Sequence, residues 1–186
     1  MADSQVKGTS LRGNLEAAQQ LYGTVVVERA IERLPAEHKQ AVRTGLLVSG
    51  WYPIAWMDEF YRALMQELPQ AQNAPEVVSR RAVEIDMKGI YGFLTRFLSP
   101  EFCIRQAPRV LGTYYKGPRI EAKILSHGHA ELHFAECHGF GRFAWRDIVA
   151  GAQRIFEEAG ARNPRLTFVS GGRDGDARAL VDVRWS

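Results

Sequence analysis

The chain has few cysteines and no long hydrophobic run, and each shortage argues against a class of protein. Its 186 residues include two cysteines, Cys103 and Cys137, which are too few for a disulfide framework, so we expect both to be reduced. No stretch approaches the roughly 18 consecutive apolar residues that a membrane span requires. Residues 1–8 also lack the apolar run of a signal peptide. These shortages predict a cytoplasmic protein with no membrane span.

The chain also has no large excess of charge of either sign. Lysine and arginine number 24 against 21 acidic residues, which gives a formal net charge of +3. The densest basic points are Arg80-Arg81, Arg105 with Arg109, and Lys116 with Arg119, and apolar or acidic residues interrupt all of them. Because a nucleic-acid surface needs concentrated positive charge, we expect no nucleic-acid partner.

The hydrophobic content of 46% is enough for a packed core, and no repeat or Gly/Ser linker divides the sequence. The chain is therefore predicted to form a single domain over residues 1–186, with residues 1–10 as a flexible tail. Up to about residue 116 the apolar residues follow helical spacing. The expected helices cover residues 15–22, 25–34, a segment opened by Pro35, 53–68, 75–98 and 107–116.

From Pro118 the hydrophobic period changes to two, which indicates strands. We expect residues 119–126 to pair with 130–137, and residues 166–169 to pair with 180–185, each pair forming an antiparallel hairpin. A helix over 145–159 separates the two hairpins. The predicted fold class is therefore α+β, with N-terminal helices packed on a four-stranded antiparallel sheet in the C-terminal half (hairpin, helix, hairpin).

Sequence patterns that would indicate a metal site or an enzyme are weak. His127, His129, His133 and His138 lie close together, but His129 and His133 are about 13 Å apart along a strand, too far to share an ion. Cys137 and His138 point to opposite faces of a strand and cannot readily act as nucleophile and base. Residues 171–176 resemble only a fragment of a calcium loop. We predict no metal, no catalytic residues and a protein that is not an enzyme.

Aromatic residues beside basic ones offer a better candidate for a site. Tyrosine and tryptophan provide apolar rings with polar ends, which suit a pocket, although most such rings form core. We expect a ligand site between helices and sheet that is lined by Trp56, Tyr91 and Tyr115. Lys116 and Arg119 would hold an anionic group by charge-assisted hydrogen bonds. The alternative for Arg119 is a surface ion pair with a carboxylate such as Glu136.

Two stretches carry a resemblance to a known superfamily. The Gly172-Arg-Asp-Gly-Asp176 segment leading into Leu180–Trp185 looks like its closing Gly-Asp hairpin, and Tyr115-Lys-Gly-Pro-Arg119 is similar to its Tyr-x-Ser-x-Arg haem-propionate motif. The superfamily comprises the haem-NO-binding (H-NOX) domains, the four-vinyl-reductase-type small-molecule-binding domains and the TRAPP vesicle-tethering subunits. Residues 8–23 and 50–53 also resemble an uncharacterised myxobacterial protein family of similar length.

The resemblance implies a proximal histidine about a helix and a turn before Tyr115. Residues 45–118 contain no histidine, so the sequence argues against haem and leaves the cofactor unknown. The resemblance implies a non-enzymatic small-molecule-binding or sensory domain in bacterial signalling or regulation. The alternative is a dimeric protein-interaction or scaffold module without a ligand. The expected partners are accordingly a small molecule or a protein, with a homodimer as one form.

Overall fold

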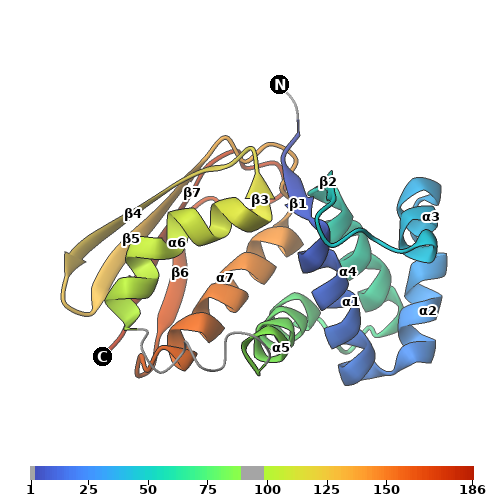
Figure 1. Cartoon of the computed structure of the whole chain (residues 1–186), viewed down its shortest axis with the longest axis horizontal. Helices are drawn as coiled ribbons and strands as arrows, with labels where there is room; N and C mark the ends of the chain where they lie inside the picture. The colour runs from blue at the N-terminus through green and yellow to red at the C-terminus, as the bar shows by residue number, and fades with distance from the viewer. Residues whose placement is uncertain (1–2, 89–98) are drawn as a thin grey trace.

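The computed structural model describes residues 3–88 and 99–186, and these form a helical half joined to a sheet-containing half (Figure 1). The helices are α1 (Gly8–Tyr22), α2 (Thr24–Glu32), α3 (Ala36–Thr44), α4 (Ala55–Glu67), α5 (Ala74–Lys88), α6 (Pro100–Tyr114) and α7 (Arg142–Glu158). The strands are β1 (Gln5–Lys7), β2 (Trp51–Pro53), β3 (Tyr115–Lys116), β4 (Arg119–Ser126), β5 (His129–Ala135), β6 (Arg165–Ser170) and β7 (Ala179–Arg184). The predicted α+β class is confirmed.

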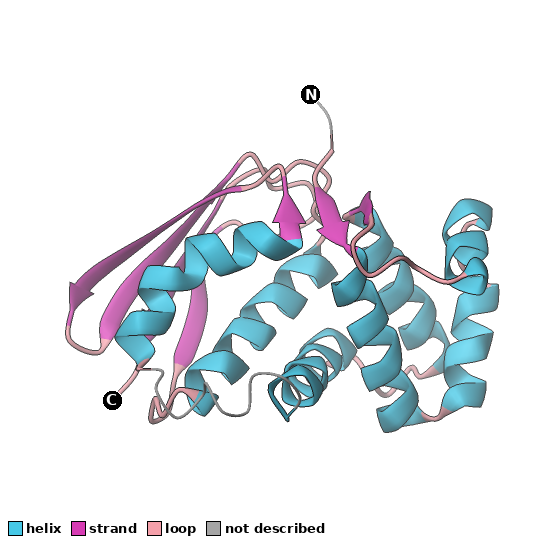
Figure 2. Cartoon of the chain, in the orientation of Figure 1, coloured by secondary structure: helices cyan, strands magenta, loops and turns pink. Residues whose placement is uncertain are grey.

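The main sheet has the strand order β4-β5-β7-β6, and every neighbouring pair is antiparallel. Both predicted hairpins are therefore present, and the register pairs Arg119 with Ala135 and Leu166 with Val183. Alternate residues of β5 and β7 are buried, which places one face of the sheet against the core. Helices α6 and α7 cover that face (Figure 2).

A second, three-stranded sheet of order β2-β1-β3 was not predicted, because its strands are too short to show a period of two. It joins segments far apart in sequence: Val6 pairs with both Tyr52 and Tyr115. Residues 5–10 do not form the flexible tail that was predicted, because β1 is the central strand of this sheet, Val6 is fully buried and α1 begins at Gly8. Strand β1 thus connects the helical half to the segment just before β4.

The predicted helices are largely confirmed, with differences at their ends. Helix α1 begins at Gly8, and α6 begins at Pro100, where Ser99 caps it by accepting a hydrogen bond from the Phe102 amide at 3.2 Å. The sequence predicts a start at residue 107 for this helix, which is too late, because α6 begins at Pro100 and continues through Pro108. The end of the helix predicted over 75–98 lies outside the described residues.

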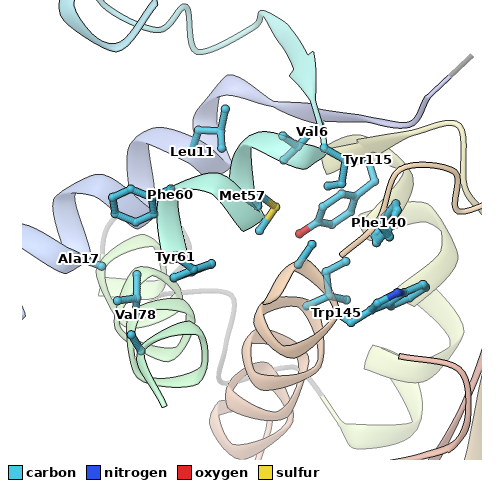
Figure 3. Close-up of a cluster of buried hydrophobic side chains, with 14 of the residues drawn as sticks. Val6, Leu11, Ala17, Met57, Phe60, Tyr61, Val78, Tyr115, Phe140 and Trp145 are labelled. Atoms are coloured by element: carbon cyan, nitrogen blue, oxygen red, sulfur yellow. The ribbon is translucent and has the colours of Figure 1, made fainter. Parts of the chain in front are cut away.

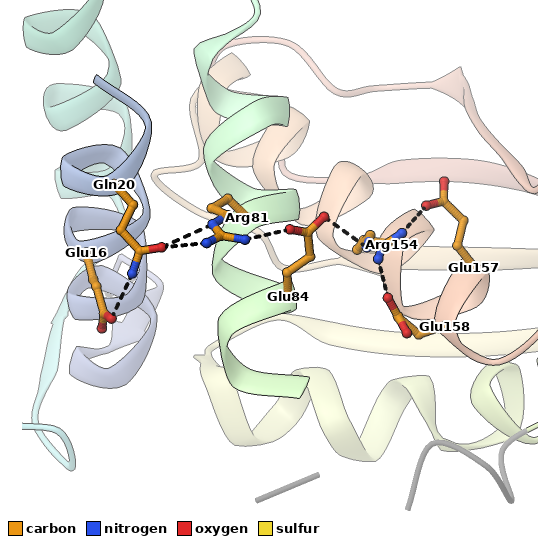
Figure 4. A network of polar contacts seen from close by, with 7 residues as sticks. All are labelled: Glu16, Gln20, Arg81, Glu84, Arg154, Glu157 and Glu158. Carbon is orange, nitrogen blue, oxygen red and sulfur yellow. Dashed lines mark hydrogen bonds and ion pairs between the residues drawn. The ribbon is translucent and has the colours of Figure 1, made fainter. Parts of the chain in front are cut away.

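One continuous hydrophobic core runs between the two halves (Figure 3). Helices α4, α5 and α7 supply Met57, Tyr61, Val78 and Trp145, all fully or almost fully buried. Around the outside of α5, charged side chains fasten it to both neighbouring helices (Figure 4). Arg81 of α5 donates to Gln20 of α1 at 2.8 Å, and Glu84 of α5 pairs with Arg154 of α7 at 3.4 Å. None of the helices in the described residues could span a membrane.

Candidate functional site

Tyr115 lies where the helical half, α6 and the main sheet meet. It follows α6 directly, pairs with Val6 in the small sheet, and packs its ring against Phe140 with 6.2 Å between ring centroids. Its hydroxyl points into the interior (Figure 3). Burial raises the pKa of the Tyr115 hydroxyl well above its ordinary value, with a further contribution from the nearby Asp147 carboxylate. The hydroxyl is therefore protonated and is available as a hydrogen-bond donor on the inner side of the molecule.

Trp145 is the largest fully buried side chain, and it sits in the first turn of α7 beneath the main sheet. Its ring contacts Phe140 at 4.7 Å and meets Phe134 of β5 edge-on at 5.5 Å. The indole Nε1–H has no hydrogen-bond partner in the structure as described. A buried donor without an acceptor costs about 1–3 kcal/mol, so such groups are uncommon in folded proteins.

Asp147 follows Trp145 by two positions in α7 and lies where four helices meet. Its Oδ1 accepts hydrogen bonds from the Tyr61 hydroxyl of α4 and from Asn14 Nδ2 of α1, the latter at 2.9 Å. The Ser79 hydroxyl of α5 donates to the backbone carbonyl of Asp147 at 2.7 Å. Burial raises the pKa of Asp147 to about 7, although these hydrogen bonds oppose the shift. We call these four residues the Asp147 centre.

The predicted ligand-binding residues come from different elements of the fold. Trp56 stacks between His38, at 4.3 Å, and Tyr52, at 5.2 Å, within the helical half. Lys116 is exposed beside the buried Tyr115. Tyr91 lies outside the described residues. A common site for these residues and Arg119 stays a prediction.

Arg119 projects from the side of the main sheet opposite to the core, with 70% of its side chain exposed. Its carboxylate neighbour is Glu121, at 3.7 Å, rather than Glu136. Both residues line a shallow surface hollow of about 420 Å³ together with His133, Ser170 and Arg178. Arg119 can therefore bind an anion that approaches from solvent, but not one that lies in the interior of the protein.

Two histidines of the main sheet contact carboxylates, and both cysteines are unreactive. His129 contacts Asp182 at 2.7 Å, and His133 contacts Glu131 at 2.8 Å. Burial raises the pKa of the Cys103 thiol to about 11 and that of Cys137 to about 12, so neither forms the thiolate that a nucleophile requires. Within residues 3–88 and 99–186, no three histidine, cysteine, aspartate or glutamate side chains are arranged to hold a metal ion.

The Asp147 centre was missed at the sequence level, although one signal pointed to it. Asp147 stands between Trp145 and Ile148 in a helix whose apolar stripe faces the core. A carboxylate at that position must find buried partners. The partners Asn14, Tyr61 and Ser79 could not be found, because they come from three other helices and show no spacing that links them.

No protein-family model matches the chain, and no curated protein matches it in sequence. Solved structures match it over almost its full length. An oxygen-binding H-NOX domain related to soluble guanylate cyclases has a TM-score of 0.71 at 13% identity, covering 97% of this chain and 95% of that one. The Fe(II) unliganded H-NOX protein from K. algicida has a TM-score of 0.70 at 9% identity, covering 97% and 96%. A structure from work on haem redox potential and porphyrin distortion has a TM-score of 0.67 at 13% identity, covering 96% and 99%.

The sequence argument against haem is contradicted, because structures that share this fold are named for their haem. The donor set nevertheless limits how a haem could be held. No histidine lies on α5 or α6, and the buried His38 instead stacks on Trp56 and contacts Glu59 at 2.8 Å. Histidine ligation from these two helices does not fit the residues present. A porphyrin held by a residue other than histidine would not need a histidine on these helices.

The order of elements matches the resemblance that the sequence carried, with helices followed by hairpin, helix and hairpin. The likenesses to four-vinyl-reductase-type domains, to TRAPP subunits and to the myxobacterial family stay predictions. At 9–14% identity the neighbours establish the architecture rather than a shared ligand. This chain therefore has the fold of the H-NOX domains.

Proposed function

We propose that this chain is a non-enzymatic sensory domain that binds a small molecule on the helix-covered side of its main sheet. The observation that carries the proposal is the Trp145 indole N–H, a buried donor for which the described residues offer no acceptor. A ligand with an acceptor atom would satisfy it. Tyr115 supplies a second buried and protonated donor, whose hydroxyl points away from the indole, toward Met57 and the start of α7 (Figure 3). The indole donor and the rings of Phe134 and Phe140 around it suit a flat ligand that carries an oxygen or nitrogen acceptor.

Haem is the first ligand to test, because it is the cofactor named for the neighbours that share the fold. In this chain the Tyr115-Lys-Gly-Pro-Arg119 segment offers a hydroxyl and a guanidinium, and both groups bind carboxylates such as haem propionates. The side chain of Arg119 faces solvent in the structure, so it would serve an anionic group that reaches the outside of the sheet. We expect signalling rather than catalysis, since burial raises the pKa of both cysteine thiols and leaves neither as an activated nucleophile.

The alternative of a docking module without a ligand depends on exposed aromatic rings. Trp56 is almost fully buried, and its partners are His38 and Tyr52 rather than solvent. Trp51 lies under the Lys7 ammonium at 5.8 Å. These rings form part of the packing of the helical half instead of an open apolar patch. At Trp51, Tyr52 and Trp56 the packing therefore favours the sensory proposal over the docking module.

The experiment is a thermal-shift and binding titration of the full chain with haem, nucleotides and fatty acids. We expect one of these classes to raise the melting temperature of the wild type. Trp145→Phe keeps an aromatic ring but removes the N–H donor, so it should weaken that binding by about tenfold or more. Trp51→Phe is the matched control, because it changes a tryptophan outside the site, and its affinity should equal that of the wild type.

Two results would contradict the proposal. One is the absence of any shift across the three ligand classes. The other is a ligand whose affinity is the same for the wild type, Trp145→Phe and Trp51→Phe, because such a ligand would bind away from the inner side of the sheet.

A further inference from the structure

Strand β4 is an edge strand of the main sheet. Its neighbour is β5, and its other side carries a row of backbone groups that the sheet leaves unpaired. The strand is eight residues long, and its second half exposes apolar side chains, with Leu125 50% and Ile124 36% accessible. Long exposed edges are usually protected from pairing with another chain. The protection here consists of charges at Arg119, Glu121 and Lys123.

We propose that β4 pairs antiparallel with β4 of a second copy of this chain, about a two-fold axis at Ala122. This register places Glu121 of each copy directly opposite Lys123 of the other, so that two ion pairs form on the outer face. It also places Ile120 opposite Ile124 of the second copy on the inner face. Opposite charges and β-branched residues directly across from each other both stabilise antiparallel pairs. Glu121 and Lys123, which protect the edge from pairing with other chains, therefore attract each other across this dimer.

Neighbouring registers lose either this complementarity or a backbone hydrogen-bond donor. A two-fold axis at Glu121 sets the two Glu121 carboxylates against each other and Arg119 against Lys123, and an axis at Lys123 sets two ammonium groups together. An axis at Ile120 pairs Arg119 with Glu121 but brings Pro118 into the ladder, where it cannot donate a backbone hydrogen bond. The axis at Ala122 alone, among these four, gives attraction in a ladder that spans residues 119–125 and leaves Pro118 out.

Helix α6, which lies beside β4, also exposes apolar side chains. Helix α6 packs along β4, and Glu101 at its start contacts His127 in the β4–β5 turn at 3.2 Å. Phe102 and Val110 of α6 are 47% and 40% exposed. A second copy placed against β4 would bring its own α6 beside this helix, as the two-fold axis requires. Paired strands flanked by apolar helix surface form a continuous interface between the sheets of two molecules.

The test is sedimentation velocity of the full chain over a wide concentration range, with charge-reversal variants. The wild type should form a dimer whose fraction rises with concentration. Glu121→Lys and Lys123→Glu each turn both ion pairs into like-charge contacts, so each should raise the dissociation constant by about tenfold or more. The double variant, which exchanges the two charges, should dimerise like the wild type. An equimolar mixture of the two single variants should form heterodimers.

Arg165→Glu is the control, because it reverses an exposed charge on β6, the opposite edge of the sheet, and should leave dimerisation unchanged. Equal melting temperatures would show that every variant is folded. A wild type that is monomeric at all concentrations would overturn the proposal. So would a dimer that resists both single reversals, or one that the double exchange fails to restore. The dimer does not rest on ligand binding, so it can fail or succeed independently of the proposed sensory function.

Discussion

Tyr61 and Asp147 are 86 positions apart in the sequence, yet the Tyr61 hydroxyl donates a hydrogen bond to the Asp147 carboxylate in the centre of the molecule. Asn14 donates to the same oxygen, and Ser79 to the backbone of Asp147. These contacts tie α1, α4 and α5 to α7, which also carries Trp145. The Asp147 centre therefore sets the position of α7 against the helical half, and with it the position of the Trp145 ring under the sheet.

Replacing Tyr61 with phenylalanine should destabilise the fold. The change leaves a buried carboxylate with one hydrogen bond fewer, which costs about 1–3 kcal/mol. Tyr22→Phe is a suitable control, because Tyr22 is partly exposed at the end of α1. Urea denaturation of the three proteins at pH 7 measures the difference. A Tyr61→Phe variant as stable as the wild type would mean that this hydrogen bond contributes nothing net.

The stability of the protein should depend on the ionisation of Asp147. Burial raises the pKa of this carboxyl to about 7, so the folded protein retains a proton that the unfolded chain releases at its ordinary pKa near 4. The free energy of unfolding contributed by Asp147 is therefore highest below about pH 4, and it is lost as the pH rises through about 7. Asp147→Asn cannot ionise and should lose this dependence, which denaturation at several pH values would detect. An unchanged pH profile in the variant would contradict the assignment.

His38 should act with the opposite sign. Burial lowers the pKa of this imidazole to about 4, so between about pH 4 and 6.5 the unfolded chain binds a proton that the folded protein excludes. Its contribution to the free energy of unfolding is present above about pH 6.5 and is lost as the pH falls toward 4. His38→Phe preserves the stacking on Trp56 but cannot titrate, so its stability should fall less steeply on acidification. A steeper loss in the variant would refute this interpretation.

The start of α7 depends on a carboxylate from α4. Asp58 accepts hydrogen bonds from the backbone amides of Gly141 at 3.1 Å and Phe143 at 2.9 Å, which would otherwise be unpaired at the helix end. A methyl group on Gly141 would lie 2.2 Å from the Asp58 carboxylate, so Gly141→Ala should destabilise the protein by about 1–2 kcal/mol through loss of this cap. Gly112→Ala in α6 meets no atom within 4 Å and should be neutral or slightly stabilising. Equal melting temperatures for the two variants would contradict the cap.

The sequence predicts the main sheet well because β4 and β5 alternate apolar and polar residues over most of their length. It does not predict β1 and β2, because three residues are too few to show a period and their pairing joins segments about 45 positions apart. The candidate site was predicted less well for the same reason. The ring of Tyr115 was found from its local motif, whereas the partners of Asp147 meet through packing between helices that no local pattern records.

Native mass spectrometry of the full chain after incubation with haem, and in parallel with nucleotides and fatty acids, tests the central claim most directly. The proposal that this chain senses a small molecule predicts one bound molecule per chain for at least one of these classes, with a smaller bound fraction for Trp145→Phe than for Trp51→Phe. A spectrum that contains only the bare polypeptide under all three conditions would contradict the claim.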